Sequence, residues 1–211
     1  MPEHPHFHLR VFFQKKGRLA LLSHLELARA LERTVRRAAL PYAVSAGFSP
    51  HMKIAFGSAL PVGVGGDEEC FDVQLTSYVA PEKVLEALAR VSVGDLMVSA
   101  VYPIGNKVPA ASVAYPLSVY EAKFFCAPRR ALLPPETITV VRKSKEKELV
   151  VADFLEGDML WEDATLTFSL WSKPTGSLRV DLLVESIAKQ DETLELISLT
   201  RIHQHALLNL L

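Results

Sequence analysis

Cysteine is scarce in this chain, and long apolar runs are missing from it. The two cysteines, Cys70 and Cys126, are too far apart for a CxxC metal or redox pair, and we expect both to be buried, inert thiols. No apolar run reaches the roughly 18 residues that a membrane helix needs. The start, Met-Pro-Glu-His-Pro-His, lacks the layout of a signal peptide. The sequence therefore predicts a cytoplasmic protein without a membrane partner.

Motifs for nucleotide hydrolysis and covalent catalysis are also missing. The chain holds no P-loop, G-x-G-x-x-G, G-x-S-x-G or Cys-His nucleophile arrangement. His24, His51 and the pair Glu68 and Glu69 lack the i, i+4 or short-loop spacing that marks a zinc motif. We predict neither a metal site nor a cofactor.

Charge is unevenly distributed along the 211 residues, although the net charge is only −1. Residues 1–60 hold nine Lys or Arg against three Asp or Glu, a balance of +6, so the remaining 151 residues carry −7. Such asymmetry favours a polyanionic partner for the basic segment, or a fit between the two parts of the chain.

Apolar periodicity predicts an α+β domain over residues 1–104. An alternating strand at 7–14 precedes a helix that Ser23 and Glu26 open as a capping box and Pro41 ends. The further elements are extended stretches at 42–45 and 53–56, a Gly-rich loop at 63–66, a strand at 71–75, a helix from Pro81 to Gly94, and a strand at 96–102. The order βαββαβ is typical of ferredoxin-like domains.

Residues 105–116 lack periodicity and are rich in proline, which predicts a linker. Beyond it, over 117–211, the predicted element order repeats without a sequence repeat, and residues 178–184 fit a strand as well as a helix. The expected elements are a strand at 118–126, a short helix at 129–133, a hairpin at 138–151, a strand at 166–171, a helix near 180–187 and a strand at 194–202. The sequence thus predicts two tandem ferredoxin-like domains.

Four arginines form a stripe on the first predicted helix. Arg29, Arg33, Arg36 and Arg37 stand at i, i+4, i+7 and i+8, and guanidinium groups so arranged are suited to contacting phosphates. The alternative is an ordinary solvated face, because Glu26 and Glu32 are spaced to pair with Arg29 and Arg36. Arg33 and Arg37 are the members that local pairing explains least.

The loop from Ser45 to Lys53 carries residues suited to binding a ligand. Gly47 permits a sharp backbone turn, Phe48 supplies an aromatic ring, and His51 and Lys53 supply hydrogen-bond donors. The alternative is a structural turn with Phe48 in the core, and for Phe48 we favour that alternative. His51 and Lys53 are the better functional candidates.

The first strand exposes a second candidate face. His8, Arg10 and Phe12 lie together on the side of the sheet that the helices leave open, where sheet-based RNA binders place stacking and phosphate-contacting groups. The alternative, which we favour, is that the second domain covers this face and Phe12 serves packing.

A longer pattern over residues 9–75 resembles a known family. It reads Gly17-x-Leu19, Ser23-His24-Leu25-Glu26-Leu27-x-Arg29, Arg33-x-x-Arg36-Arg37-Ala38, Leu40-Pro41, Ser45-x-Gly47-Phe48-Ser49-Pro50-His51-x-Lys53-Ile54 and Ala59-Leu60-Pro61-x-Gly63. It is similar to the radical-SAM-linked bacterial proteins of unknown function, which occur alone or as C-terminal parts of cobalamin-binding-type radical SAM proteins. The resemblance implies a radical SAM partner and an association with RNA-related proteins. The chain itself lacks the CxxxCxxC that holds a radical SAM cluster.

Three functions fit these observations. The first is an accessory module that binds RNA or another phosphorylated ligand for a radical SAM partner, without catalytic activity of its own. Its candidate residues are His24, Arg29, Arg33, Arg37, Gly47, Phe48, His51 and Lys53. The second is an enzyme acting on RNA or a nucleotide, with His24 or His51 as acid or base beside Glu26, Glu68 or Glu69. The third is a scaffold that docks the acidic surface of a radical SAM enzyme.

Overall fold

The computed structural model describes residues 7–105, 107–142, 145–174 and 176–206. These residues form two compact units. Unit 1 holds residues 7–62 and 66–114, and unit 2 holds residues 63–65 and 115–206. Each unit is built on antiparallel strand pairs with few helices, so the chain is an α+β protein. None of the described helices is long and apolar enough to cross a membrane.

The sheet of unit 1 has the strand order β4-β1-β3-β2, and each neighbouring pair is antiparallel. Its strands are β1 (Phe7–Lys15), β2 (Ile54–Phe56), β3 (Val64–Leu75) and β4 (Leu96–Pro103). The predicted Gly-rich loop at 63–66 is wrong, because β3 begins at Val64 and extends through the glycines. Because β1 and β2 each pair antiparallel with β3, they run parallel to one another with β3 between them.

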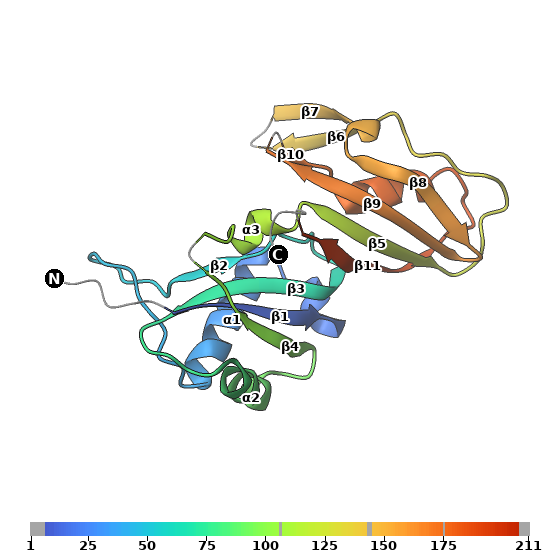
Figure 1. Ribbon diagram of the computed structural model, residues 1–211. Helices are drawn as coiled ribbons and strands as arrows, with labels where there is room; N and C mark the ends of the chain where they lie inside the picture. The colour runs from blue at the N-terminus through green and yellow to red at the C-terminus, as the bar shows by residue number, and fades with distance from the viewer. Residues whose placement is uncertain (1–6, 106, 143–144, 175, 207–211) are drawn as a thin grey trace. The chain divides into compact units, whose positions relative to one another are not determined.

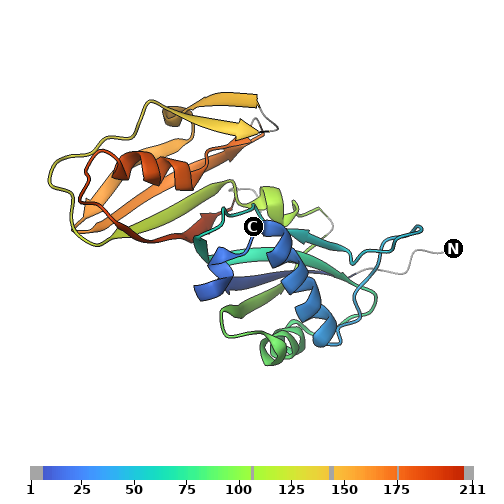
Figure 2. The same cartoon turned by 180° about the vertical axis from the view of Figure 1, so that it is seen from behind.

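Two helices, α1 (His24–Arg37) and α2 (Pro81–Val91), lie on one face of this sheet (Figures 1 and 2). The capping box of α1 is confirmed: Ser23 accepts from the Glu26 N–H, and the Glu26 carboxylate accepts from the Ser23 N–H. Helix α2 begins at Pro81 as predicted but ends at Val91, where Ser92 donates its hydroxyl to the Leu88 carbonyl. Shorter helices are the 3-10 turn η1 (Gly17–Leu21) and α3 (Ala111–Ala114).

The core of unit 1 lies between the helices and the sheet. Alternation along the strands and helical spacing along α1 and α2 turn the apolar side chains to this layer, where complete burial stabilises each by roughly 1.5–3 kcal/mol. The central members are Leu9, Val11, Phe13, Leu31, Val35, Phe71, Val73, Leu75, Val84 and Leu88.

Unit 2 has a sheet with the order β10-β9-β5-β11, and β8 pairs with β9. Its strands are β5 (Leu117–Phe124), β8 (Leu155–Glu162), β9 (Thr165–Lys173), β10 (Gly176–Ser177) and β11 (Leu196–His205). A separate antiparallel pair joins β6 (Thr137–Arg142) to β7 (Lys145–Val150), and the 3-10 turn η2 (Val151–Asp153) follows. Helix α4 (Val180–Ala188) resolves the ambiguous segment largely as helix.

Several expectations for unit 2 are wrong. Residues 129–133 form no helix, so the described part of unit 2 departs from the order βαββαβ. Strand β8 was not predicted. Cys126 is exposed and donates its thiol to the Thr193 carbonyl at 3.3 Å, whereas Cys70 is buried as expected.

Candidate functional site

The arginine stripe of α1, defined as Arg29, Arg33, Arg36 and Arg37, is exposed along its length. Arg36 lies 3.9 Å from the Glu32 carboxylate, as its spacing predicts, and its guanidinium carbon is 6.0 Å from the centre of the Tyr42 ring. Within the described part of the chain, no carboxylate lies within 4.0 Å of the Arg33 or Arg37 guanidinium. The expected pair of Arg29 with Glu26 is not formed either, because the Glu26 carboxylate binds Ser23, so among the described residues three charges of the stripe have no carboxylate within 4.0 Å.

Glu26 is used at the start of α1. Its carboxylate accepts from the Ser23 hydroxyl at 2.7 Å and from the Ser23 N–H at 2.9 Å. The Ser23 hydroxyl bond, the Ser23 backbone bond and the nearby charge of Arg29 lower the pKa of Glu26. A carboxylate held in its charged form in this way is a helix cap and a poor proton donor.

Residues 42–53 form a two-stranded projection, here called the arm, that reaches beyond the sheet (Figures 1 and 2). Tyr42 pairs with Leu75 at its base, and Val44 pairs with Met52 further out. The Ser45 N–H then donates to the His51 carbonyl at 2.8 Å, and the His51 N–H donates to the Ser45 hydroxyl at 3.0 Å. These bonds hold the tip, residues 46–50, away from the core.

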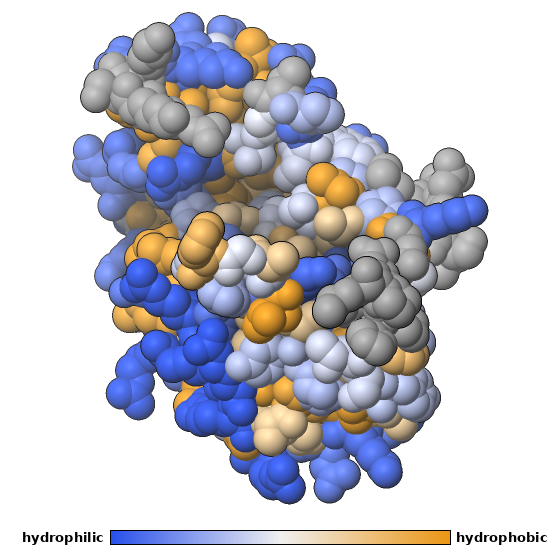
Figure 3. Space-filling model, turned by 90° about the vertical axis from the view of Figure 1, so that its left-hand side faces the viewer, coloured by the Kyte–Doolittle hydropathy of each residue, from blue (hydrophilic) through white to orange (hydrophobic). Residues whose placement is uncertain are grey.

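The tip presents an aromatic side chain to solvent. The Phe48 side chain is fully exposed to solvent, so the expectation that it packs in the core is wrong. Gly47 has a backbone φ of +119°, a value that residues other than glycine rarely adopt. The space-filling view shows hydrophobic groups standing among strongly hydrophilic side chains on the surface of unit 1 (Figure 3).

The predicted loop residues divide between the tip and the base of the arm. His51 is exposed, and its Nε2 lies 3.5 Å from the Ser49 hydroxyl. Lys53 is half-buried at the base, where its backbone bonds to both sides: its N–H donates to the Ala43 carbonyl, and its carbonyl accepts from the Gln74 N–H.

His24 lies in a different place, at the start of α1. Its ring meets the Phe56 ring edge to face at 5.7 Å. The two rings and Glu69 line a cavity of about 20 Å³, which is space for about one water molecule. Of the acid–base groups in the enzymatic interpretation, His24 and Glu69 line this cavity together, whereas His51, Glu26 and Glu68 do not line it.

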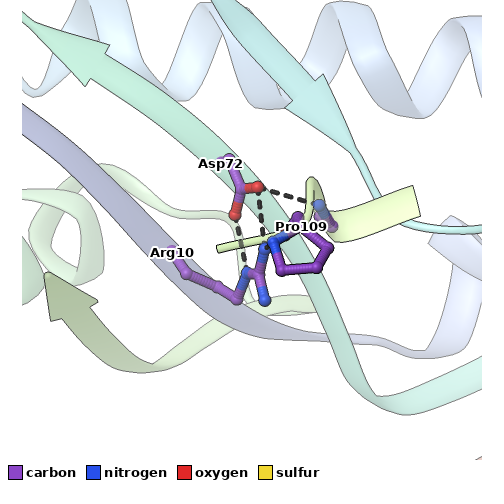
Figure 4. Close-up of polar contacts among 4 residues, drawn as sticks. Arg10, Asp72 and Pro109 are labelled. Carbon is purple, nitrogen blue, oxygen red and sulfur yellow. Dashed lines mark hydrogen bonds and ion pairs between the residues drawn. The ribbon is translucent and has the colours of Figure 1, made fainter. Parts of the chain in front are cut away.

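Arg10 forms a buried ion pair with Asp72 on the face of the unit 1 sheet that α1 and α2 do not cover (Figure 4). Its Nε and NH2 donate to the two Asp72 carboxylate oxygens at 2.7 and 2.9 Å, and NH2 also donates to the Pro109 carbonyl at 2.7 Å. Asp72 also accepts from the Ala111 N–H at 2.8 Å. The phosphate-contacting interpretation is therefore wrong for Arg10, which instead holds the expected linker segment.

Asp191 is the main charged group that sequence reasoning missed. It accepts from the backbone N–H of Arg129 at 2.9 Å and from the hydroxyl and N–H of Thr193. The Arg129 backbone bond and the two Thr193 bonds lower the pKa of Asp191 to about 2.

Within the described ranges, no group of three His, Cys, Asp or Glu side chains is placed to hold a metal ion.

The geometry defines a class of protein: a small α+β protein with a basic helix beside a projecting arm that ends in an exposed aromatic ring. Residues 8–167 match the family model described as "Uncharacterized protein conserved in bacteria (DUF2344)", and the chain belongs to this family. Comparison with curated proteins found no match. Because the family is uncharacterised, the radical SAM partner stays a prediction from the resemblance.

Proposed function

We propose that the protein is an accessory module that binds single-stranded RNA and delivers it to a radical SAM partner. The observation that carries the proposal is the combination of two guanidinium groups without a local carboxylate, Arg33 and Arg37, with the fully exposed Phe48. Helix α1 leads directly into the base of the arm, where Arg36 lies over Tyr42. This contact joins the C-terminal end of α1 to the base of the arm.

This combination suits a single strand because its two components perform different tasks. Guanidinium groups contact backbone phosphates in any sequence. An exposed ring offers a platform on which a base stacks, worth roughly 1–3 kcal/mol per base. Gly47 supports the same interpretation, since a sharp tip presents the Phe48 ring with little surrounding side-chain bulk.

Two further parts of the proposal concern architecture. We propose that unit 1 is a ferredoxin-like domain, which its strand order β4-β1-β3-β2 with two helices on one face supports. Unit 2 is proposed to be a diverged copy, in which β9, α4 and β11 keep one half of the motif and the β6–β7 pair replaces the first helix. The boundaries proposed are 1–104 and 117–211.

The test is capture from native lysate with the purified protein as bait, with RNA and protein both identified. We expect RNA to be recovered, and recovery to fall when Arg33→Ala and Arg37→Ala are combined. Nuclease treatment distinguishes two ways of capturing a radical SAM protein. A partner bridged by RNA is lost after the treatment, whereas a partner that binds the bait directly is kept. Equal RNA recovery by the wild type and the double variant would contradict the proposal, as would recovery of protein without RNA.

A further inference from the structure

A cleft of about 330 Å³ lies in unit 1, apart from the arginine stripe. Its charged and polar lining comes from His8 on β1, Asp72 and Gln74 on β3, and Lys53 at the base of the arm. Its apolar lining includes Ile54, Ile104 and Val108. The volume is at the lower end of the roughly 300–1,000 Å³ range of small-molecule sites, which typically combine apolar walls with a few polar groups.

The charge in this cleft is positive. Both Asp72 carboxylate oxygens accept from Arg10, and one also accepts from the Ala111 N–H, so the negative charge of Asp72 is compensated within the fold. Lys53 is different: no carboxylate of the described chain lies within 4.0 Å of its ammonium group. A lysine that lines a partly apolar cleft without a neighbouring carboxylate favours an anion in the cleft.

Hydrogen bonds to the backbone hold several of the residues that line the cleft. The Ile104 N–H donates to the His8 carbonyl at 2.9 Å, and the Val108 N–H donates to the Gly105 carbonyl at 3.0 Å. Further along, Arg10 holds the Pro109 carbonyl. Such bonds order the cleft in the free protein, which lowers the entropic cost of binding a ligand.

From this geometry we infer that the cleft binds a small organic anion. Its phosphate or carboxylate contacts the Lys53 ammonium, and its apolar part lies against Ile104 and Val108. Gln74, which stands opposite His8 in the β1–β3 register, supplies an amide that both donates and accepts hydrogen bonds. The inference does not depend on RNA binding by the arginine stripe.

The test is thermal unfolding of the full chain with matched charged and neutral probes. Uridine 5′-monophosphate is compared with uridine, and benzoate with benzamide. At about ten times Kd, we expect the anion of at least one pair to raise the Tm by about 3–6 °C, while its neutral counterpart raises it by less than about 1 °C. The pair that responds tells whether phosphate or carboxylate is preferred.

Variants then locate the effect. Lys53→Met, which keeps the aliphatic stem, is expected to abolish the shift, and Lys53→Arg to retain part of it. The matched control Lys83→Met removes an exposed lysine from α2 and is expected to leave the shift unchanged. The double variant Arg33→Ala with Arg37→Ala is also expected to leave it unchanged, which separates this site from RNA binding. An absent shift for both anions, a shift that persists in Lys53→Met, or equal shifts with the neutral probes would overturn the inference.

Discussion

Replacing Asp72 by Asn is expected to destabilise unit 1 far more than an ordinary polar substitution. The amide keeps the shape of the carboxylate but leaves the Arg10 guanidinium, which is 4% exposed, without its counter-charge. Removing one partner of a buried ion pair typically costs about 3–5 kcal/mol. Asp72 is itself 12% exposed, so solvent screens the pair little and the expected loss lies within that range.

The assay follows the two units separately in urea. Both tryptophans, Trp161 and Trp171, belong to unit 2, so intrinsic fluorescence reports that unit and serves as an internal control. Amide exchange of β1 and β3 reports unit 1. The paired replacement of Arg10 by Met and Asp72 by Leu is expected to recover much of the loss, because it leaves no unpaired buried charge. A cost for Asp72→Asn below about 1 kcal/mol, or a double variant as unstable as the single one, would refute this reasoning.

Three further outcomes are expected. Phe48→Ala should leave the free energy of unfolding within about 0.5 kcal/mol of wild type but weaken binding of a single-stranded oligoribonucleotide by roughly 1–3 kcal/mol, measured by urea unfolding and fluorescence anisotropy. Because bonds from Arg129 and Thr193 lower the pKa of Asp191 to about 2, this carboxylate stabilises the fold above its unfolded pKa near 3.8 and loses that effect as pH falls through about 2. The urea midpoint of Asp191→Asn should therefore vary less than that of wild type between pH 4 and 2, and equal variation would contradict it. Ser23→Ala should cost about 1 kcal/mol through loss of the α1 cap, and an unchanged midpoint would show that the cap contributes nothing.

Local patterns in the sequence were sufficient for the elements of unit 1. The Ser23 and Glu26 capping box and Pro81 at the first position of α2 act within a few residues, so the sequence alone predicts both helix starts. The end of α2 was missed because Ser92 ends it before Gly94 is reached.

Contacts between distant residues explain the main errors. The Asp72 carboxylate that binds Arg10 is 62 positions away in the sequence, and no local pattern indicates the pair. The failed helix at 129–133 has a local cause, because the segment is only five residues long and Pro134 disfavours helical backbone at Leu133.

The candidate site was predicted only in part. Sequence spacing identified the arginine stripe and the lack of a local carboxylate at Arg33 and Arg37, but it paired Arg29 with Glu26, whose carboxylate instead caps α1. It gave Phe48 the wrong environment, because the Ser45–His51 bonds that hold the arm tip away from the core are not encoded by hydrophobicity. It also grouped Lys53 with the tip, although the side chain lines a separate cleft.

The salt dependence of RNA affinity tests the central claim most directly. Anisotropy of a labelled mixed-sequence oligoribonucleotide is measured at several salt concentrations, and log Kd is plotted against log salt. Since each phosphate contact on a single strand contributes about 0.7 to the slope, combining Arg33→Ala with Arg37→Ala should reduce its magnitude by about 1.4. The matched control, Lys83→Ala with Arg90→Ala, removes the same charge from exposed positions on α2 and should leave the slope nearly unchanged. Salt-independent binding, or equal slopes for the stripe and control variants, would contradict the account.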